Sequence, residues 1–323
     1  MRIQNLLSAI AIPAMLLVPA AHAAQQAYPD KPIRLVIGSA AGSGPDIISR
    51  VLAERLYGAW GQRIVVDPRP GVAGILSAEL VSRAAPDGYT WMMLTSQLLV
   101  ATSLYSNHKV DLEKDFASVS LIGTVAFVQV INPQVQAKSV GELIELAKKT
   151  PGALRYGSSG SGSTEHLCGF LFTRLTGTQM LHVPYKGIAQ AIADTMGGEI
   201  HITHAVVPTV LPIVQAGRLR ALAVTSRKRS SSLPDVPAIA ETVPGYDLFG
   251  WYSLVIPTGA PREVIAKVSA EVARAVKEPE IVAQLKNLGI EIAGSSPAEF
   301  DAFRREQTKR MSELVKASGV DLK

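Results

Sequence analysis

A loop of small residues, SAAGSGPD at 39–46, is the first feature of this sequence suited to binding chemistry. It follows a branched apolar run at 33–37 and precedes a helical stripe that starts from Asp46. Small side chains let a ligand approach the main chain closely, and the first N–H groups of a helix have no partner inside the helix. The pattern predicts a site for a carboxylate or phosphate. An ordinary turn with Asp46 as the N-cap is the alternative.

A second loop, YGSSGSGSTEH at 156–166, also lies between a strand pattern and a helix pattern. Its serines and glycines supply hydrogen-bond donors on a flexible main chain, and Ser163 or Thr164 is available to cap the helix. A flexible Gly/Ser linker is the alternative. The position between strand and helix favours a binding loop.

A third turn of small residues, PGVAG at 70–74, precedes a helix that begins near Ile75. We expect the three turns to converge on one anion. A hydrogen bond to a charged group is worth about 1.5–3 kcal/mol, and each helix end adds about 0.3–1 kcal/mol. Several such contacts can reach the binding free energy of a micromolar site, about −8 kcal/mol, without a buried arginine.

The sequence lacks the motifs of common catalytic loops. No serine has glycine at both flanking positions of a nucleophile elbow, and neither Gly-x-Gly-x-x-Gly nor Walker A is present.

The single cysteine, Cys168, is predicted to be a small buried hydrophobe. His201 and His204 would point to opposite faces of one strand without a third ligand nearby. We therefore predict no metal site and no cofactor.

The N-terminus has the pattern of a cleavable signal peptide. Arg2 precedes an apolar stretch at 6–18, and Ala-His-Ala at 21–23 forms a small-x-small cleavage site, so residues 1–23 are predicted to direct export. A short membrane anchor is disfavoured because the stretch is shorter than the roughly 20 residues a bilayer needs. The 323-residue chain has a net charge of only +5 and no nucleic-acid motif, so no nucleic-acid partner is expected.

Strand and helix patterns alternate along the chain. Apolar runs at 33–37, 64–66 and 89–94, separated by helical patterns, predict a βαβαβ unit with a parallel sheet. The alternation then restarts, which suggests two α/β lobes. Further strands are expected at 125–131, 154–156, 180–183, 200–205, 219–224 and 253–256, and helices at 139–149, 164–176, 188–196, 208–216, 262–277, 279–288 and 297–317.

Motifs along the mature chain resemble those of the Bug/TctC family, the periplasmic solute-binding proteins of tripartite tricarboxylate transporters. In their order they are highly specific. They are YPxKPI at 28–33, the loop at 42–46, RPGxxG at 69–74, APDGYT at 85–90, GxGSTxHL at 160–167, HVPYKG at 182–187, GRLRALAV at 217–224, LPDVP at 233–237 and Trp251-Tyr252.

The resemblance implies an α/β, two-lobed type II periplasmic binding-protein fold with a ligand cleft between the lobes. Residues 24–123 plus 249–323 would form lobe one, and residues 124–248 would form lobe two. Carried over by position, the resemblance also implies ligand contacts from both lobes. In lobe one these are Ser39, Gly42, Ser43, Gly44, Pro45, Asp46, Val72, Ala73, Gly74, and Ser96 and Gln97 in a loop after the third strand. In lobe two they are Ser159, Gly160, Ser163, Thr164, Tyr185, His204 and Ala205.

Two departures from the family pattern bear on the ligand. Family members that bind amino acids have an aspartate where Ala205 stands, which disfavours an amino-acid ligand here. His204 stands where the family often has an aromatic residue, so it could stack on a flat ligand or hydrogen-bond a distal carboxylate. The hypothesis is a non-amino mono- or dicarboxylate, aromatic acids included.

The sequence thus predicts a monomeric periplasmic solute-binding protein without enzymatic activity. It would close on a small-molecule carboxylate and deliver it to a membrane permease of the tripartite tricarboxylate type. Two alternatives stay open. One is an exported serine hydrolase or transferase that uses a serine of the 157–164 loop with His166 or His182. The other is a sensory partner that binds the ectodomain of a membrane kinase.

Overall fold

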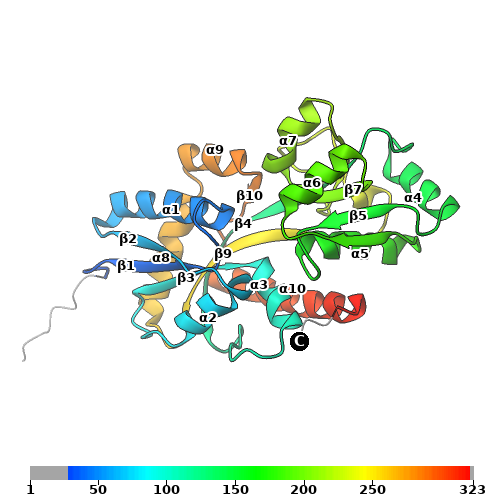
Figure 1. The fold of residues 1–323 in the computed structure, drawn as a ribbon. Helices are drawn as coiled ribbons and strands as arrows, with labels where there is room; N and C mark the ends of the chain where they lie inside the picture. Colours follow the sequence, from blue (N-terminus) through cyan, green and yellow to red (C-terminus); the bar gives the residue numbers. More distant parts are fainter. Residues whose placement is uncertain (1–27, 321–323) are drawn as a thin grey trace, which may run out of the picture.

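The computed structural model describes residues 28–320 (Figure 1). The predicted signal peptide, residues 1–23, lies outside the described residues. Across the described part of the chain, every helix is too short or too polar to cross a bilayer.

Strands and helices follow the predicted alternation. The strands are β1 (Ile33–Ile37), β2 (Ile64–Pro68), β3 (Thr90–Thr95), β4 (Phe116–Ile131), β5 (Arg155–Ser158), β6 (Leu181–Pro184), β7 (Ile202–Val206), β8 (Arg220–Val224), β9 (Phe249–Pro257) and β10 (Ile290–Ile292). The α-helices are α1 (Gly44–Trp60), α2 (Ile75–Ser82), α3 (Ser96–Leu104), α4 (Val140–Lys149), α5 (Thr164–Thr176), α6 (Ile188–Gly197), α7 (Val207–Gln215), α8 (Arg262–Ala275), α9 (Pro279–Asn287) and α10 (Pro297–Ser318). Short 3₁₀ turns lie at Val72–Gly74 and Ile239–Glu241.

The strands form one curled sheet in the order β2-β1-β3-β9-β4-β7-β5-β6, and β8 and β10 also pair with β4. β1 pairs in parallel with β2 and β3, which confirms the predicted parallel βαβαβ unit. β5 pairs in parallel with β6 and β7. In Figure 1 these two parallel groups lie on opposite sides of the molecule and are joined through β4 and β9.

Strand β4 runs through both groups. Its residues 116–126 pair with β9 and its residues 127–131 pair with β7, in both cases antiparallel. The strand begins at Phe116, well before the predicted start at Val125. The first half of β4 was not predicted because two buried serines, Ser118 and Ser120, interrupt the apolar run that indicates a strand.

Helix α3 lies where the sequence predicts a loop. Ser96 and Gln97 form its first turn, so the expectation of a loop after the third strand is wrong. The N-cap residue Thr95 is of a type favoured at that position, but its side chain makes no capping hydrogen bond. The apolar run that follows, with Leu98 and Leu99 buried, also reads as a continuation of β3. The short strand β10 was likewise not predicted.

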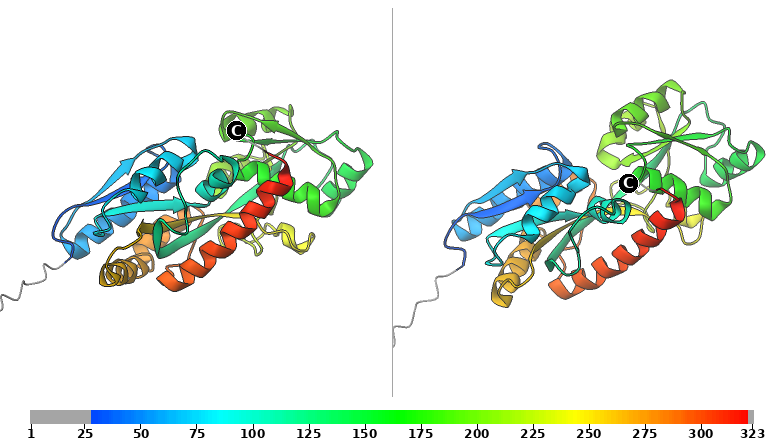
Figure 2. Two further views of the ribbon diagram at one scale, coloured as in Figure 1. Left: turned by 90° about the horizontal axis from the view of Figure 1, so that it is seen from below. Right: turned by 60° about the horizontal axis from the view of Figure 1, so that its bottom comes forward.

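Helix α10 packs against apolar cores on both sides of the molecule. Phe300, in its first turn, belongs to a cluster with Trp251 of β9. Met311 and Leu314, near its end, belong to a cluster with Leu167 of α5. Figure 2 shows α10 running along the molecule past both groups of strands. The helix assigned to lobe one by the sequence therefore also contacts the core beneath α5.

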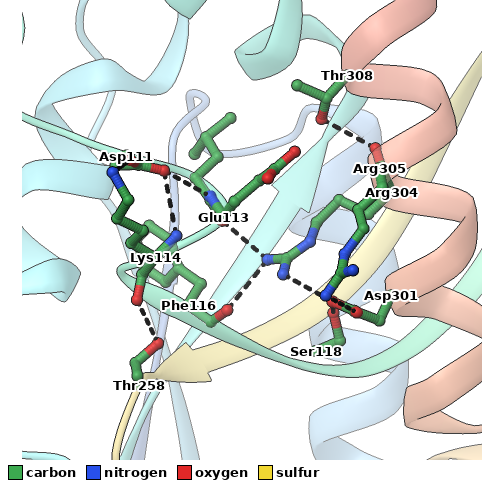
Figure 3. Close-up of polar contacts among 11 residues, drawn as sticks. Asp111, Glu113, Lys114, Phe116, Ser118, Thr258, Asp301, Arg304, Arg305 and Thr308 are labelled. Atoms are coloured by element: carbon green, nitrogen blue, oxygen red, sulfur yellow. Dashed lines mark hydrogen bonds and ion pairs between the residues drawn. The ribbon is translucent and has the colours of Figure 1, made fainter.

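Arg304 attaches α10 to the chain at the start of β4. Its buried guanidinium donates to the carbonyl oxygens of Leu112 (2.9 Å) and Phe116 (3.2 Å) and pairs with Asp301 at 3.0 Å. Figure 3 shows the Arg304 side chain reaching from α10 to Phe116 and Asp301. Because charge-assisted hydrogen bonds are stronger than neutral ones, this contact fixes the helix on the strand that crosses the molecule.

We expect Gly123→Ala to destabilise the protein by about 1–3 kcal/mol, because overpacking forces a backbone shift. Gly123 lies on β4 opposite β10, and a Cβ there would lie 2.6 Å from the carbonyl oxygen of Glu291. The measurement is the free energy of unfolding in urea. Gly141→Ala on α4 is the control: its nearest contact would be 3.8 Å away, so it should be neutral or stabilising. Equal stability of the two variants would contradict the packing at β10.

Candidate functional site

A cavity of about 270 Å³ is lined by residues from both groups of strands. Val125 and Phe127 of β4 and Gly250, Trp251 and Tyr252 of β9 form one wall. The other lining residues are Pro45, Thr95, Ser96, Gln97, Ser159, Ser163, Thr164, Glu165, Ile188 and Val206. The two crossing strands therefore carry a wall of the cavity, and helix starts and loops supply the rest.

Five helices begin at this cavity. Pro45 lies in the first turn of α1, Ser96, Thr164 and Ile188 start α3, α5 and α6, and Val206 is the N-cap of α7. The first N–H groups of each helix have no partner within it, and the helix dipole makes that end positive. The lining residues, all within the described part of the chain, include no lysine and no arginine. Any attraction for an anion therefore comes from main-chain N–H groups and from neutral side-chain donors such as Ser96 and Gln97.

Strand β9 holds two of these helix starts in place. A Cβ added to Gly44 would lie 3.2 Å from the hydroxyl of Tyr252, so α1 begins directly against that side chain. The N–H of Trp251 donates to Ser96 Oγ at 3.3 Å. Burial raises the pKa of Tyr252 to about 12, so its hydroxyl stays protonated at neutral pH.

Asp46 is paired within its own helix. The N-cap of α1 is Ser43, so the alternative with Asp46 in that role is wrong. The buried Asp46 carboxylate accepts from Gly42 N at 2.9 Å and pairs with Arg50 at 3.0 Å. The hydrogen bond from Arg50 lowers the pKa of Asp46. Its negative charge is therefore compensated locally.

A small recess of about 20 Å³ adjoins the cavity, with Pro45, Thr95 and Gln97 lining both. Here the first and third predicted turns meet: a Cβ added to Gly38 would lie 2.6 Å from Gly74 Cα. Val72 and Ala73 have φ angles of 45° and 52°. Such left-handed residues cost about 1–3 kcal/mol each and cluster at functional sites. Ser39, Ala73 and Gly74 also line this recess.

The second predicted loop caps α5. Ser163 Oγ accepts from His166 N at 3.2 Å, which confirms Ser163 as the N-cap. The loop closes on the same histidine, because Gly162 N donates to His166 Nδ1 at 3.0 Å. Burial lowers the pKa of His166, so the neutral ring remains a hydrogen-bond acceptor that holds the loop.

Ser158 and His182 form a contact behind this loop. Ser158 Oγ lies 2.7 Å from His182 Nε2, and the His166 and His182 rings stack with centroids 3.9 Å apart. Burial, together with the adjacent His166, lowers the pKa of His182 to about 4. Ser158 is fully buried and does not line the cavity, so this hydroxyl is not presented to a ligand.

Six of the predicted contact residues line the main cavity and three line only the recess. The six are Pro45, Ser96, Gln97, Ser159, Ser163 and Thr164, and the three are Ser39, Ala73 and Gly74. Gly42, Ser43, Gly44, Asp46, Val72, Gly160, Tyr185, His204 and Ala205 line neither. In the described chain, no three His, Cys, Asp or Glu side chains are grouped to hold a metal.

Tyr185 and His204 have partners inside the protein. The Tyr185 hydroxyl donates to Asp194 Oδ2 at 2.8 Å. His204 is fully buried on β7, with Nε2 3.4 Å from Gln129 Nε2. Burial lowers the pKa of His204 to about 3, so the ring is neutral. Neither side chain reaches the cavity in this conformation.

Sequence reasoning did not assign the cavity wall of crossing strands to the site. In the sequence, Trp251-Tyr252 is a family motif without a predicted ligand role, and Glu165 is part of the loop at 156–166. The lining residues that were not predicted are Thr95, Val125, Phe127, Glu165, Ile188, Val206, Gly250, Trp251 and Tyr252. The pairing of β4 with both β9 and β7, which no local pattern reveals, places Val125 opposite Gly250 and Phe127 opposite Val206.

The sequence model for the "Tripartite tricarboxylate transporter family receptor", TctC, matches residues 48–320. The chain belongs to the TctC family. BugT of Bordetella pertussis is 31% identical, over 94% of each chain. The structure of R. palustris Rpa4515 with adipate has a TM-score of 0.79 and 33% identity, covering 90% of this chain and 98% of that one. The periplasmic binding protein BugD gives a TM-score of 0.75 at 29% identity, covering 91% and 99%.

These likenesses confirm the family and the fold inferred from the motifs. This TctC-family protein has the two-lobed α/β fold of periplasmic binding proteins, and its family consists of periplasmic solute-binding receptors.

We expect the free energy of unfolding to fall as pH decreases from about 6.5 toward 4. Burial lowers the pKa of His204 from 6.5 to about 3, so in this window the unfolded chain binds the proton and the folded chain does not. The slope per buried histidine is at most about 1.4 kcal/mol per pH unit. Urea unfolding at several pH values checks this, and His204→Gln should give a shallower profile. Parallel profiles for the two proteins would contradict a buried neutral His204.

Proposed function

We propose that this protein captures a small organic carboxylate in the 270 Å³ cavity and delivers it to a membrane permease of the tripartite tricarboxylate type. One observation carries the proposal: five helix starts face the cavity, and its lining residues, all within the described chain, include no basic side chain. Main-chain N–H groups at helix N-termini suit carboxylate oxygens.

The expected energies are sufficient for such a site. Hydrogen bonds to a charged group contribute about 1.5–3 kcal/mol each, and each helix end contributes about 0.3–1 kcal/mol. Four to six such contacts, less the cost of ordering the ligand and the loops, reach the roughly −8 kcal/mol of a micromolar complex.

The apolar wall indicates the body of the ligand. Val125, Phe127, Ile188, Val206 and Trp251 present aliphatic and aromatic surface to the cavity. The similar R. palustris protein was solved with adipate, a dicarboxylate with an alkyl chain. Ala205 is buried in an apolar cluster and offers no acceptor for an α-amino group. We infer a non-amino mono- or dicarboxylate, aromatic acids included.

The proposal extends to the lobes and to export. Residues 24–123 with 249–323, and residues 124–248, would act as two lobes that close on the ligand, after residues 1–23 have directed the chain to the periplasm. Delivery to a permease, or to a sensor ectodomain, would follow from the closed form. We infer binding without catalysis, because the serine nearest to an imidazole, Ser158, is buried away from the cavity.

Isothermal titration against aspartate, glutamate, citrate, adipate, benzoate and terephthalate tests the proposed ligand class. We expect one of the non-amino acids to bind with micromolar or tighter affinity. Tight binding of an amino acid alone would refute the class.

Gln97→Glu tests the anion site with a single charge. Gln97 lies in the first turn of α3 and lines the cavity, so a carboxylate there would repel the ligand and weaken binding at least tenfold. The fold should tolerate the change, since an acid stabilises a helix N-terminus. Gln190→Glu, in the first turn of α6 but outside the cavity lining, is the matched control. Equal affinities for both variants would exclude α3 from the anion site.

Small-angle scattering tests closure. Because both lobes would contact the ligand, binding should shift the open–closed population and reduce the radius of gyration. The same titration with Gln97→Glu should require proportionally more ligand. An unchanged radius at saturating ligand would contradict a closing mechanism.

A further inference from the structure

Glu165 gives the cavity a negatively charged side. It is the second residue of α5 and is half-buried. Among the cavity-lining residues, which all lie in the described chain, it is the one charged side chain. Its carboxylate accepts a hydrogen bond from Ser159 Oγ at 2.7 Å, and the described residues supply no basic side chain that pairs with it. A site for anions therefore includes an uncompensated acid.

Because of Glu165, a ligand anion is expected to bind more favourably at the other helix starts than at the start of α5. A carboxylate in the first turn of a helix already interacts with the positive end of the dipole, so α5 offers less to a ligand anion than its neighbours do. The starts of α1 and α3, at Pro45, Ser96 and Gln97, carry no such acid aimed at the cavity, because Asp46 is paired with Arg50. The ligand carboxylate is best placed on that side.

The side near Glu165 offers acceptors. Ser159 donates its hydroxyl hydrogen to Glu165, so both residues present oxygen lone pairs to the space between them and the ligand. A second ionised carboxylate there would face another carboxylate without a cation, and like charges in a partly buried site repel strongly. A group that carries a hydrogen would instead find charge-assisted acceptors.

We propose that Glu165 determines ligand specificity by requiring a hydrogen-bond donor at the end of the ligand opposite its carboxylate; within the proposed non-amino class this donor is a hydroxyl or a primary amide. This inference rests on the proposed function and narrows its ligand class. Acids with one ionised carboxylate and a distal donor would bind better than the dicarboxylate of the same skeleton.

Matched ligand pairs test the proposal by isothermal titration: adipate against its monoamide and against 6-hydroxyhexanoate, and terephthalate against its monoamide. With the unchanged protein, the donor-bearing partner of a pair should bind at least tenfold more tightly than the dicarboxylate. With Glu165→Gln, which keeps the side-chain shape and removes the charge, dicarboxylate affinity should rise and the ratio should fall to about threefold or less.

Glu145→Gln is the control for net charge. Glu145 is exposed on α4 and does not line the cavity, so this variant should keep the original ratio. Dicarboxylate binding as tight as that of the donor-bearing partner, or a ratio unchanged by Glu165→Gln, overturns the inference while leaving carboxylate capture intact. No binding of any of these acids, or of the acids in the panel above, to either protein would reject the proposed function itself.

Discussion

Main-chain N–H groups that their own helices cannot satisfy are the feature on which this cavity depends. Five helices begin there, and the lining residues of the described chain include no lysine or arginine to supply positive charge. An arginine would bring one strong charge on a flexible stem, whereas helix starts bring several weak donors held rigidly by the fold. The attraction of the site for an anion therefore depends on how accurately the helices are placed, and less on any single side chain.

The accuracy of that placement comes from two strands that cross the molecule. β4 pairs with β9 in its first part and with β7 in its second, and β9 contacts the starts of α1 and α3 through Tyr252 and Trp251. Helix α10 adds a second connection, since its two ends lie in different apolar clusters. A relative motion of the two sides would have to bend the strands and accommodate this helix, which favours a limited hinge movement.

Two acidic side chains lie near helix starts at the cavity, and only one of them has a basic partner. Asp46 has a buried carboxylate, but Arg50 of the same helix and the N–H of Gly42, just before α1, compensate it. Glu165 has the same chemistry but receives only the hydroxyl of Ser159. The two acids occupy similar positions near the starts of α1 and α5, and their different partners give the two sides of the cavity different preferences for a ligand.

Local patterns in the sequence predicted the strands and helices other than α3 and β10, the parallel first unit, a cap of α5 at Ser163 or Thr164, and the three turns of small residues. These features depend on residues a few positions apart, so hydrophobic period, glycine and capping residues are sufficient to predict them. The start of β4 was not predicted because buried serines interrupt its apolar run, and α3 was not predicted because its apolar residues also read as a continuation of β3. Only the tertiary structure decided which residues share the cavity. Pairing of β4 with β9 and with β7 places Phe127, Trp251 and Tyr252 in the cavity wall and leaves His204 buried outside the lining. Such pairing between distant strands is set by the packing of the whole sheet.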